Sequence, residues 1–220
     1  MRIANRETNE VPNMNEENAI RSAKLLKKIF EDNGLEYWFD YGALLGTIRG
    51  HKFIPWDTDI ETYIYYKDDK VIGMLADSFR KYGLKVDVLP FNLEIYENDK
   101  YVSMCVSWFK KTELTRLLGI ACYHIPNIIR KGIIHFMQEF YSKSTHDIIR
   151  PDAGAEREKK KLCLLVRYFS PIFFCGKLRE ANLYDFKVSV PAKAEELLFI
   201  RYGKDWRIPK KKYRSYTTWI

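Results

Sequence analysis

Three carboxylates at alternate positions, Asp57, Asp59 and Glu61, most constrain how this chain can fold. If the segment DTDIE is a strand, these acids share one face and the Thr and Ile side chains between them point to the other. Neighbouring Cα atoms on that face are about 6.7 Å apart, so the repulsion is about 0.6 kcal/mol in water and about 2.5 kcal/mol at an effective dielectric of about 20. In a cleft the row needs a cation, and all-oxygen ligands favour Mg²⁺ or Mn²⁺ over zinc. A solvated acidic edge is the alternative interpretation of the triplet alone.

The residues before the triplet favour the metal interpretation. Gly42 and Gly46 bracket a short apolar segment, Ala43-Leu44-Leu45, that can begin a helix whose free N–H groups face a phosphate. Arg49, His51 and Lys52 then place positive charge just before the acids. A glycine-started turn, a basic cluster and an acidic strand within about twenty residues suit a metal-bridged phosphate ester.

Two separated segments resemble one known family. The run WFDYGALLGTIRG followed by FIPWDTDIE resembles the signature of the LicD phosphotransferases, which include fukutin and the fukutin-related protein, and VPAKAEELLFIRYGKDWRIP resembles that family's closing segment. The resemblance implies a nucleotidyltransferase-like fold in which the segment from Gly42 to Gly46 is the phosphate-side turn. It also implies magnesium-dependent transfer of a phosphorylated alcohol, such as phosphocholine or ribitol phosphate, from a CDP-activated donor to a glycan hydroxyl.

The resemblance assigns an expected role to each site residue. Asp57, Asp59 and Glu61 hold one or two Mg²⁺ ions that bridge the donor diphosphate. Arg49, His51 and Lys52 lie on the donor side, where Arg49 and Lys52 steady the phosphates, and Gly42 and Gly46 allow close backbone approach. Tyr41 and Trp56 are candidates to stack on a base or to pack the turn, with packing expected for Trp56.

The chain departs from the family pattern at two places. Glu61 stands where the family commonly has a third aspartate, and glutamate still ligates with a longer reach. The family also takes another acid from a later strand, whereas the best-aligned strand here, YVSMCVSWF, contains none. Asp87 or Glu94 is the candidate substitute, and the general base stays open.

Two other functions use the same features. A nucleotidyltransferase moving NMP from NTP to a small molecule or RNA needs the same acids, and a non-catalytic module binding RNA or glycan needs only the basic half. RNA binding normally adds stacking platforms or a recognisable module, neither of which is found in the sequence, so a nucleic-acid partner is not expected. The expected partners are a CDP-linked donor and a cell-surface or lipid-linked carbohydrate acceptor.

The periodicity predicts an α/β (α+β) domain with a small mixed sheet flanked by helices, followed by a mainly helical basic half. Residues 1–112 form the expected nucleotidyltransferase-like core, and residues 113–220 form a helical region completing the same domain. The first helix is capped by Asn13 or Asn15 and ends at Gly34, and a short helix runs from Gly42 to Arg49. A second amphipathic helix runs from about Asp69 to Gly83. The expected strands are Glu36 to Asp40, Asp57 to Tyr65, Leu84 to Leu89, Leu93 to Tyr96 and Tyr101 to Phe109, the last two joined by an Asn98-Asp99 turn.

Charge is distributed unevenly between the halves. The net charge of +8 combines −4 over residues 1–100 with +12 over residues 101–220. Basic residues such as Arg130 alternate with apolar ones after Leu114, which suits either a helix on an anionic membrane or a packed helix with a solvated basic face, the second being favoured. The polar first eighteen residues lack a secretory h-region, and the four cysteines read as buried thiols, so a cytoplasmic location is expected. Peripheral contact with the inner face of the membrane is expected if the basic half binds anionic lipid.

Overall fold

The structure, a computed structural model, describes residues 14–97, 103–114, 117, 126, 128–133, 135–136 and 176–210. The chain divides into two compact units, one made of Met1–Trp108 with Asn182–Val188 and the other of Phe109–Ala181 with Ser189–Ile220. The predicted division into residues 1–112 and 113–220 stays a prediction.

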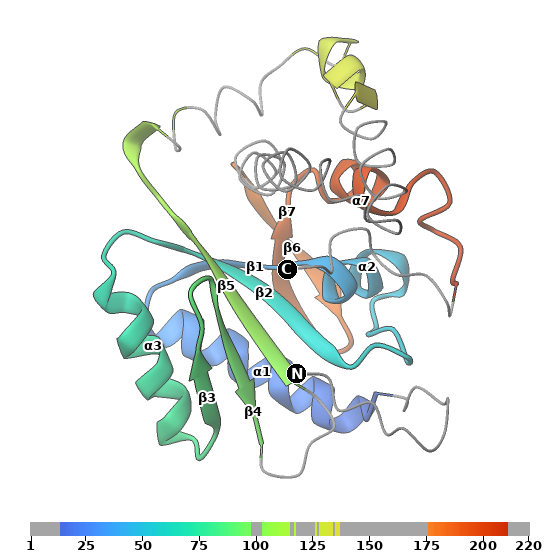
Figure 1. Cartoon of the computed structure of the whole chain (residues 1–220). Coiled ribbons are helices and arrows are strands. Elements are labelled where there is room, and N and C mark those ends of the chain that lie inside the picture. Colours follow the sequence, from blue (N-terminus) through green and yellow to red (C-terminus); the bar gives the residue numbers. More distant parts are fainter. Residues whose placement is uncertain are drawn as a thin grey trace, which may run out of the picture. The chain divides into compact units, whose positions relative to one another are not determined.

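A five-stranded sheet forms the centre of the first unit (Figure 1). Its strands, in spatial order, are β1 (Glu36–Phe39), β2 (Asp59–Tyr66), β5 (Ser103–Lys110), β4 (Asn92–Tyr96) and β3 (Lys85–Val88). The pairs β1–β2, β3–β4 and β4–β5 are antiparallel. Ser103 N donates to Thr58 O and Thr62 Oγ1 donates to Cys105 O, so β5 runs parallel to β2. The sheet is therefore mixed, and the predicted α/β class is confirmed.

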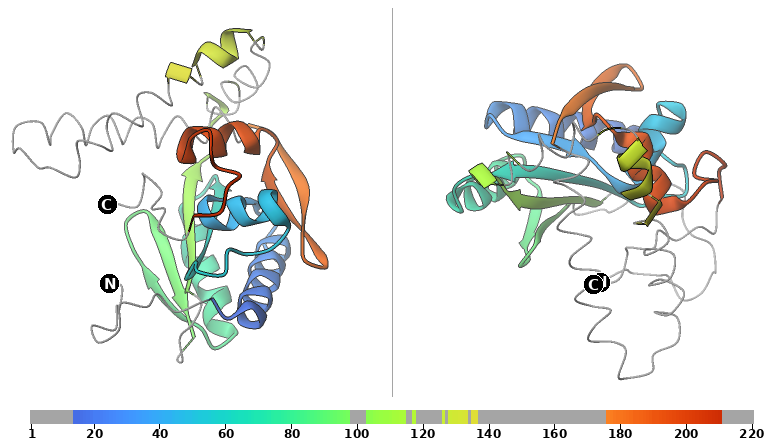
Figure 2. Two further views of the ribbon diagram at one scale, coloured as in Figure 1. Left: turned by 90° about the vertical axis from the view of Figure 1, so that its right-hand side faces the viewer. Right: turned by 90° about the horizontal axis from the view of Figure 1, so that it is seen from above.

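One face of this sheet is apolar and carries the helices α1 (Glu16–Asp32) and α3 (Lys70–Lys81), which lie side by side (Figures 1 and 2). Phe30 of α1 contacts the Tyr37 ring at 4.9 Å and the Phe79 ring of α3 at 6.5 Å between centroids. Both helices carry apolar residues at helical spacing. The buried apolar side chains of the two helices pack against the strand side chains on this face of the sheet. This packing forms the core that holds β1 and β2 in place.

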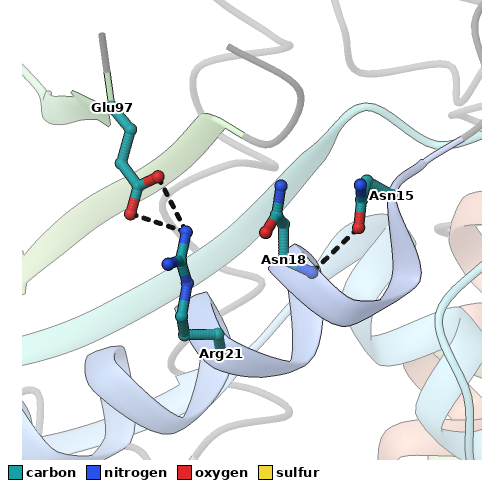
Figure 3. A network of polar contacts seen from close by, with 4 residues as sticks. All are labelled: Asn15, Asn18, Arg21 and Glu97. Carbon is teal, nitrogen blue, oxygen red and sulfur yellow. Dashed lines mark hydrogen bonds and ion pairs between the residues drawn. The ribbon is translucent and has the colours of Figure 1, made fainter. Parts of the chain in front are cut away.

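The N-terminus of α1 is capped as the sequence predicts. Asn15 is the N-cap, and its side chain accepts a hydrogen bond from Asn18 N at 3.0 Å. Gly34 follows the helix with a φ of 61°, in the left-handed region that favours glycine. Arg21 of α1 donates to both carboxylate oxygens of Glu97 at the end of β4 (Figure 3). This exposed pair contributes little to stability.

The opposite face of the sheet is polar. The β4–β5 register places Asn92 opposite Ser107 and Glu94 opposite Cys105, while Leu93 and Ile95 point to the buried side. Asp59 and Glu61 of β2 alternate with the buried Ile60 and Thr62, so they point to this polar side as well. The predicted sharing of one face is confirmed for these two acids. The strand was predicted to begin at Asp57 but begins at Asp59, so Asp57 lies in the loop before it.

The structure contains a hairpin that was not predicted from the sequence. It consists of β6 (Leu178–Leu183) and β7 (Phe186–Pro191), in a region expected to be helical. Its tip belongs to the first unit and reaches α1 (Figure 2). Asp185 at the tip pairs with Lys24 of α1 at 2.7 Å. The alternation in FKVSV was the available signal.

In the second unit, α7 (Ala194–Tyr202) ends at Gly203, which has a φ of 77°. Glu196 of α7 accepts a hydrogen bond from Arg130 Nε at 2.5 Å. Arg130 is 1% exposed, so its expected place on a solvated or lipid-facing basic surface was wrong. The nearby Ile128 is 83% exposed. The Glu196 carboxylate compensates the buried charge of the Arg130 guanidinium.

Candidate functional site

The turn between β1 and α2 (Tyr41–Gly50) begins the site. Asp40, 1% exposed, is the N-cap of α2, and its carboxylate accepts from Tyr41 N at 2.8 Å. Tyr41 has a φ of 44°, a left-handed conformation that costs a residue with a Cβ about 1–2 kcal/mol. The surrounding contacts must therefore hold this turn in place.

Two glycines on one side of α2 let the chain return along the helix. A Cβ on Gly46 would stand 2.3 Å from Lys52 O and 3.2 Å from Phe53 Cα, and a Cβ on Gly42 would stand 1.9 Å from Asp57 Oδ2. Residues four apart lie on the same helix face. The loop after α2 therefore runs back over the helix backbone and delivers Asp57 to its N-terminus.

The acidic triplet meets α2 at the same place. Glu61 Oε2 accepts a hydrogen bond from Gly42 N at 3.3 Å, and Asp57 Oδ2 lies against the Gly42 Cα. Asp57 Oδ1 also accepts from Thr58 N at 3.0 Å, while Asp59 begins β2 between the other two acids. The first two N–H groups of α2, those of Tyr41 and Gly42, thus donate to the carboxylates of Asp40 and Glu61.

The electrostatics show an excess of negative charge. Burial raises the pKa of Glu61 well above its ordinary value, and the charges of Asp59, Asp57 and Asp40 raise it further, against the lowering by the Gly42 N–H. Burial also raises the pKa of the half-buried Cys105 thiol to about 11, with smaller contributions from Glu61 and Asp59. The predicted buried state of the other three cysteines concerns residues outside the described ranges.

The predicted basic residues lie toward the other end of α2. Arg49 is in its last turn and His51 is its C-cap, with a φ of 56°. The rise along a helix puts Arg49 about 10 Å from Gly42. His51 Nδ1 lies 3.2 Å from Asn182 O, and Lys52 is exposed. The loop that follows brings only the Lys52 backbone back to Gly46, so a donor role for these three residues stays a prediction.

The two candidate stacking residues differ in their surroundings. The Tyr41 ring packs against Tyr63 at 6.4 Å between centroids, and Tyr63 in turn stacks on Trp38 at 5.3 Å. Trp56 is half-buried in the loop before the acids. The described contacts therefore give Tyr41 a packing role in the turn.

The register separates the two candidates for the later acid. Asp87 pairs with Glu94, and Glu94 pairs with Cys105 on β5, which adjoins β2. With strands about 4.8 Å apart, Glu94 is about 10 Å from the β2 backbone and Asp87 about 14 Å. Asp87 also accepts a hydrogen bond from Tyr96 OH at 2.9 Å. Glu94 is therefore the better placed acid.

Two residues of the site region were missed by the sequence analysis. Asp40 was assigned only to a strand, although an acid directly before YG at a helix start is an N-cap signal. Tyr184 at the hairpin tip accepts from Phe53 N at 3.1 Å and donates to Glu16 Oε1 at 2.8 Å, so it fixes the loop that leads to Asp57. No local pattern marks Tyr184, because its partners are distant in sequence.

The residues present fit a hard divalent cation by their chemistry. The cluster offers oxygen ligands alone. Burial raises the pKa of Glu61 most, and the charges of Asp59, Asp57 and Asp40, which raise it further, are charges that a cation would neutralise. Within the described ranges, no three His, Cys, Asp or Glu side chains already form a metal-binding group. The metal role of Asp57, Asp59 and Glu61 therefore stays a prediction.

Comparisons with known proteins relate the chain to one family. Residues 34–149 match the family model described as LicD/FKTN/FKRP, nucleotidyltransferase domain. The chain is 26% identical to mouse ribitol-5-phosphate transferase FKTN over 188 residues, which cover 86% of this chain and 33% of that protein. It is 38% identical to human ribitol 5-phosphate transferase FKRP over 47 residues, covering 21% of this chain and 10% of FKRP.

Other matches are shorter or more distant. An uncharacterized protein of Rickettsia typhi is 28% identical over 76 residues, covering 33% of this chain and 25% of that protein. The crystal structure of ANT(2")-Ia in complex with adenylyl-2"-tobramycin has 12% sequence identity and a TM-score of 0.36, covering 44% of this chain and 52% of that chain. The chain thus spans a third or less of the length of these curated relatives. Because the family match runs from the end of α1 through the acid cluster and covers more than half of the sequence, the chain belongs to the LicD family.

Proposed function

We propose that this chain is a phosphotransferase that moves a phosphorylated alcohol, of the phosphocholine or polyol-phosphate kind, from a CDP-activated donor to a hydroxyl of a cell-surface or lipid-linked glycan. The observation that carries the proposal is the meeting of Asp57 and Glu61 at Gly42, on the N-terminus of α2. Family membership supports it, as do the two relatives named ribitol-phosphate transferases.

In this proposal Asp57, Asp59 and Glu61 would hold Mg²⁺ or Mn²⁺. When bound, the metal neutralises phosphate charge during in-line attack by the acceptor hydroxyl. Gly42 keeps the Asp57 carboxylate at the helix start, where the N-terminal dipole favours anionic groups. Arg49 and Lys52 contact donor phosphate oxygens, and Glu94, on the same polar face, accepts the acceptor proton.

A donor screen tests this proposal directly. CDP-choline, CDP-ribitol, CDP-glycerol, ATP and UTP are each added to the protein with and without Mg²⁺, and the thermal midpoint is recorded, because ligands of the native state raise it. A CDP ester should raise the midpoint in a Mg²⁺-dependent way and release CMP on turnover. The Arg49→Lys variant should bind the donor more weakly, because a guanidinium can donate two hydrogen bonds to one phosphate and an ammonium group cannot match that geometry.

The second candidate is transfer of NMP from an NTP, which the nucleotidyltransferase description of the matched family favours. Attack then falls on the α-phosphorus, so pyrophosphate is released instead of CMP. Stabilisation by ATP or UTP with Mg²⁺, and none by CDP esters, would select this reaction. Ligand binding without product release would select a non-catalytic module.

We also propose that the protein works in the cytoplasm at the inner face of an anionic membrane, since residues 101–220 carry a net charge of +12. Within the described residues, no helix is both long and apolar enough to cross a membrane. Sedimentation with anionic vesicles should fall steeply between low and physiological salt, because screening removes the attraction. Equal partitioning onto neutral vesicles would contradict the proposal.

A further inference from the structure

Strand β3 forms one edge of the five-stranded sheet, and its neighbour among the described strands is β4 (Figure 1). An edge strand presents unpaired backbone N–H and C=O groups, to which another strand can bond. Exposed apolar side chains surround this edge: Tyr82 before the strand, Val88 at its end, and Leu89 and Phe91 in the turn after it. Apolar side chains grouped on the surface are typical of an interaction site.

The hydrogen bonds to β4 determine which backbone groups of β3 face outward. Leu89 N donates to Asn92 O at 2.9 Å, and residues of an antiparallel pair alternate between hydrogen-bonded and non-hydrogen-bonded positions. Every second residue therefore directs its backbone groups to β4: Lys85, Asp87 and Leu89. The residues between them direct theirs away from the sheet: Val86 and Val88.

One described contact reaches this outer edge. Arg80 of α3 donates from Nη2 to Val86 O at 3.4 Å, and its Nη1 donates to Asp77 at 2.9 Å. The contact agrees with a carbonyl that points away from β4. At 3.4 Å the bond is long, and both partners are exposed, so a backbone N–H can replace the Arg80 side chain on Val86 O.

The charges on β3 favour one register for pairing with a second copy of the chain. Two copies of an edge strand join in antiparallel orientation about a two-fold axis. Lys85 and Asp87 both point to the polar face, because Asp87 lies opposite Glu94 in the ladder. An axis through Val86 places Lys85 of each copy opposite Asp87 of the other, which stabilises the pair. An axis through Lys85 or through Asp87 opposes like charges.

The remaining axes interrupt the backbone bonds. An axis through Val88 places Val86 opposite Pro90, which has no N–H. An axis through Leu84 needs an N–H that already donates to Phe79 O at 3.4 Å. With the axis through Val86, the outward N–H and C=O groups of the two Val86 residues bond to each other. Self-pairing of β3 is therefore best satisfied in this register.

We propose that β3 is the contact strand of a two-fold symmetric dimer, in which two copies of the five-stranded sheet join by antiparallel β3–β3 pairing with Val86 on the axis. The occupant of the edge is a second copy of this chain, because the Lys85 and Asp87 charges are complementary to themselves in this register. Continued past the strand, the same register brings the exposed turn with Leu89 and Phe91 toward Tyr82 of the other copy. The dimer needs neither a metal nor a donor, so it is independent of the proposed function.

Charge reversal tests the register. In sedimentation equilibrium the average mass of the wild type should rise with concentration toward twice the mass of one chain. Lys85→Glu and Asp87→Lys should each raise the dissociation constant of the dimer by about tenfold or more, because each opposes like charges at two symmetric positions. The combined Lys85→Glu/Asp87→Lys variant should return to within about threefold of wild type. An equimolar mixture of the two single variants should form a heterodimer, since both cross-copy pairs are then of opposite charge.

Three further variants serve as controls. Lys67→Glu makes the same change in net charge at an exposed position between β2 and α3. Tyr96→Phe removes the 2.9 Å hydrogen bond from Tyr96 OH to Asp87, which Asp87→Lys also loses. Both should dimerise like the wild type. Val86→Pro should abolish the dimer and keep the bonds to β4, because the Val86 N–H points outward.

Several results would overturn the proposal. One is a wild type that stays monomeric at every concentration, and another is a dimer that tolerates both charge reversals. Failure of the two single variants to associate with each other would also exclude this register. A dimer that forms only after Arg80→Ala would show that Arg80 keeps the edge of β3 closed in the wild type.

Discussion

Asp57 Oδ2 lies 1.9 Å from the point where a Cβ on Gly42 would stand, and it is the far end of a side chain. The corresponding neighbour of Gly46 is the backbone oxygen of Lys52, at 2.3 Å. A side-chain end can swing away, whereas a backbone atom moves only with its loop. The two glycines of GALLG therefore have different roles. Gly42 leaves room for the Asp57 carboxylate, and Gly46 leaves room for the backbone of the loop that follows α2.

Gly42→Ala should damage the site while largely sparing the fold. The added methyl group displaces the Asp57 carboxylate, so Mn²⁺ binding and CMP release should each fall at least tenfold, about 1.4 kcal/mol. The thermal midpoint should fall by less than about 4 °C. Metal titration and thermal unfolding of the same preparation check both. Unchanged Mn²⁺ binding would show that Asp57 has room to move without consequence.

Gly46→Ala should instead destabilise the protein. The methyl group meets the backbone of residues 52–54, and such overpacking costs about 1–3 kcal/mol. Denaturant unfolding at neutral pH measures the loss, and Gly50→Ala is the control, because nothing lies within 4 Å of the corresponding Cβ position. Equal free energies of unfolding for the two variants would contradict the close packing of loop and helix.

Local patterns predicted most of the first unit. The Asn15 cap, the Gly34 end of α1 and the acids on alternate positions of β2 depend on near neighbours, and each was predicted from the sequence. The same holds for strand β4, where the alternation of NLEIY places Leu93 and Ile95 inside. The mixed sheet then follows, because these elements have few other ways to bury their apolar sides.

Long-range contacts could not be predicted in this way. The hairpin tip reaches Glu16 and Phe53 through Tyr184, more than 130 positions away from either. The buried Arg130 pairs with Glu196 of α7, which is also distant in sequence. The sequence placed glycines and acids close together, but it did not show that the carboxylates themselves occupy the first N–H groups of α2. That arrangement depends on the path of the return loop.

Asp59→Asn should abolish turnover of the CDP ester that stabilises the wild type, because a neutral amide is a poor Mg²⁺ ligand. The metal-free variant should be at least as stable as wild type, since removing one charge relieves repulsion with Glu61, whose pKa is raised in part by Asp59. CMP release and the metal-free thermal midpoint are the two measurements. Wild-type turnover in this variant, or in chelator-treated protein, would refute the metal role.

Tyr184→Phe should destabilise the first unit at neutral pH. The hydroxyl accepts from Phe53 N and donates to Glu16 Oε1, and its removal leaves the Phe53 N–H without that acceptor. The expected loss is about 1–3 kcal/mol in the free energy of unfolding. Glu16→Gln is the matched control, because an amide oxygen still accepts from the hydroxyl. An effect of Tyr184→Phe no larger than that of the control would show that the hairpin tip is held mainly by other contacts.

The advantage of Tyr184 over Phe should disappear at high pH. Burial, followed by the hydrogen bond to Glu16, raises the pKa of Tyr184 from its ordinary value of 10.0 to about 12. A raised folded-state pKa means that the unfolded chain loses its proton first, so the stabilisation is complete below pH 10 and is lost as the pH rises through 12. Tyr184 is partly exposed, and solvent screening reduces the size of the effect. Urea unfolding of wild type and Tyr184→Phe at pH 8, 10 and 11.5 gives the difference in free energy at each pH. A difference that stays constant over this range would contradict the raised pKa, whereas a shrinking one would confirm that the neutral hydroxyl holds the hairpin tip.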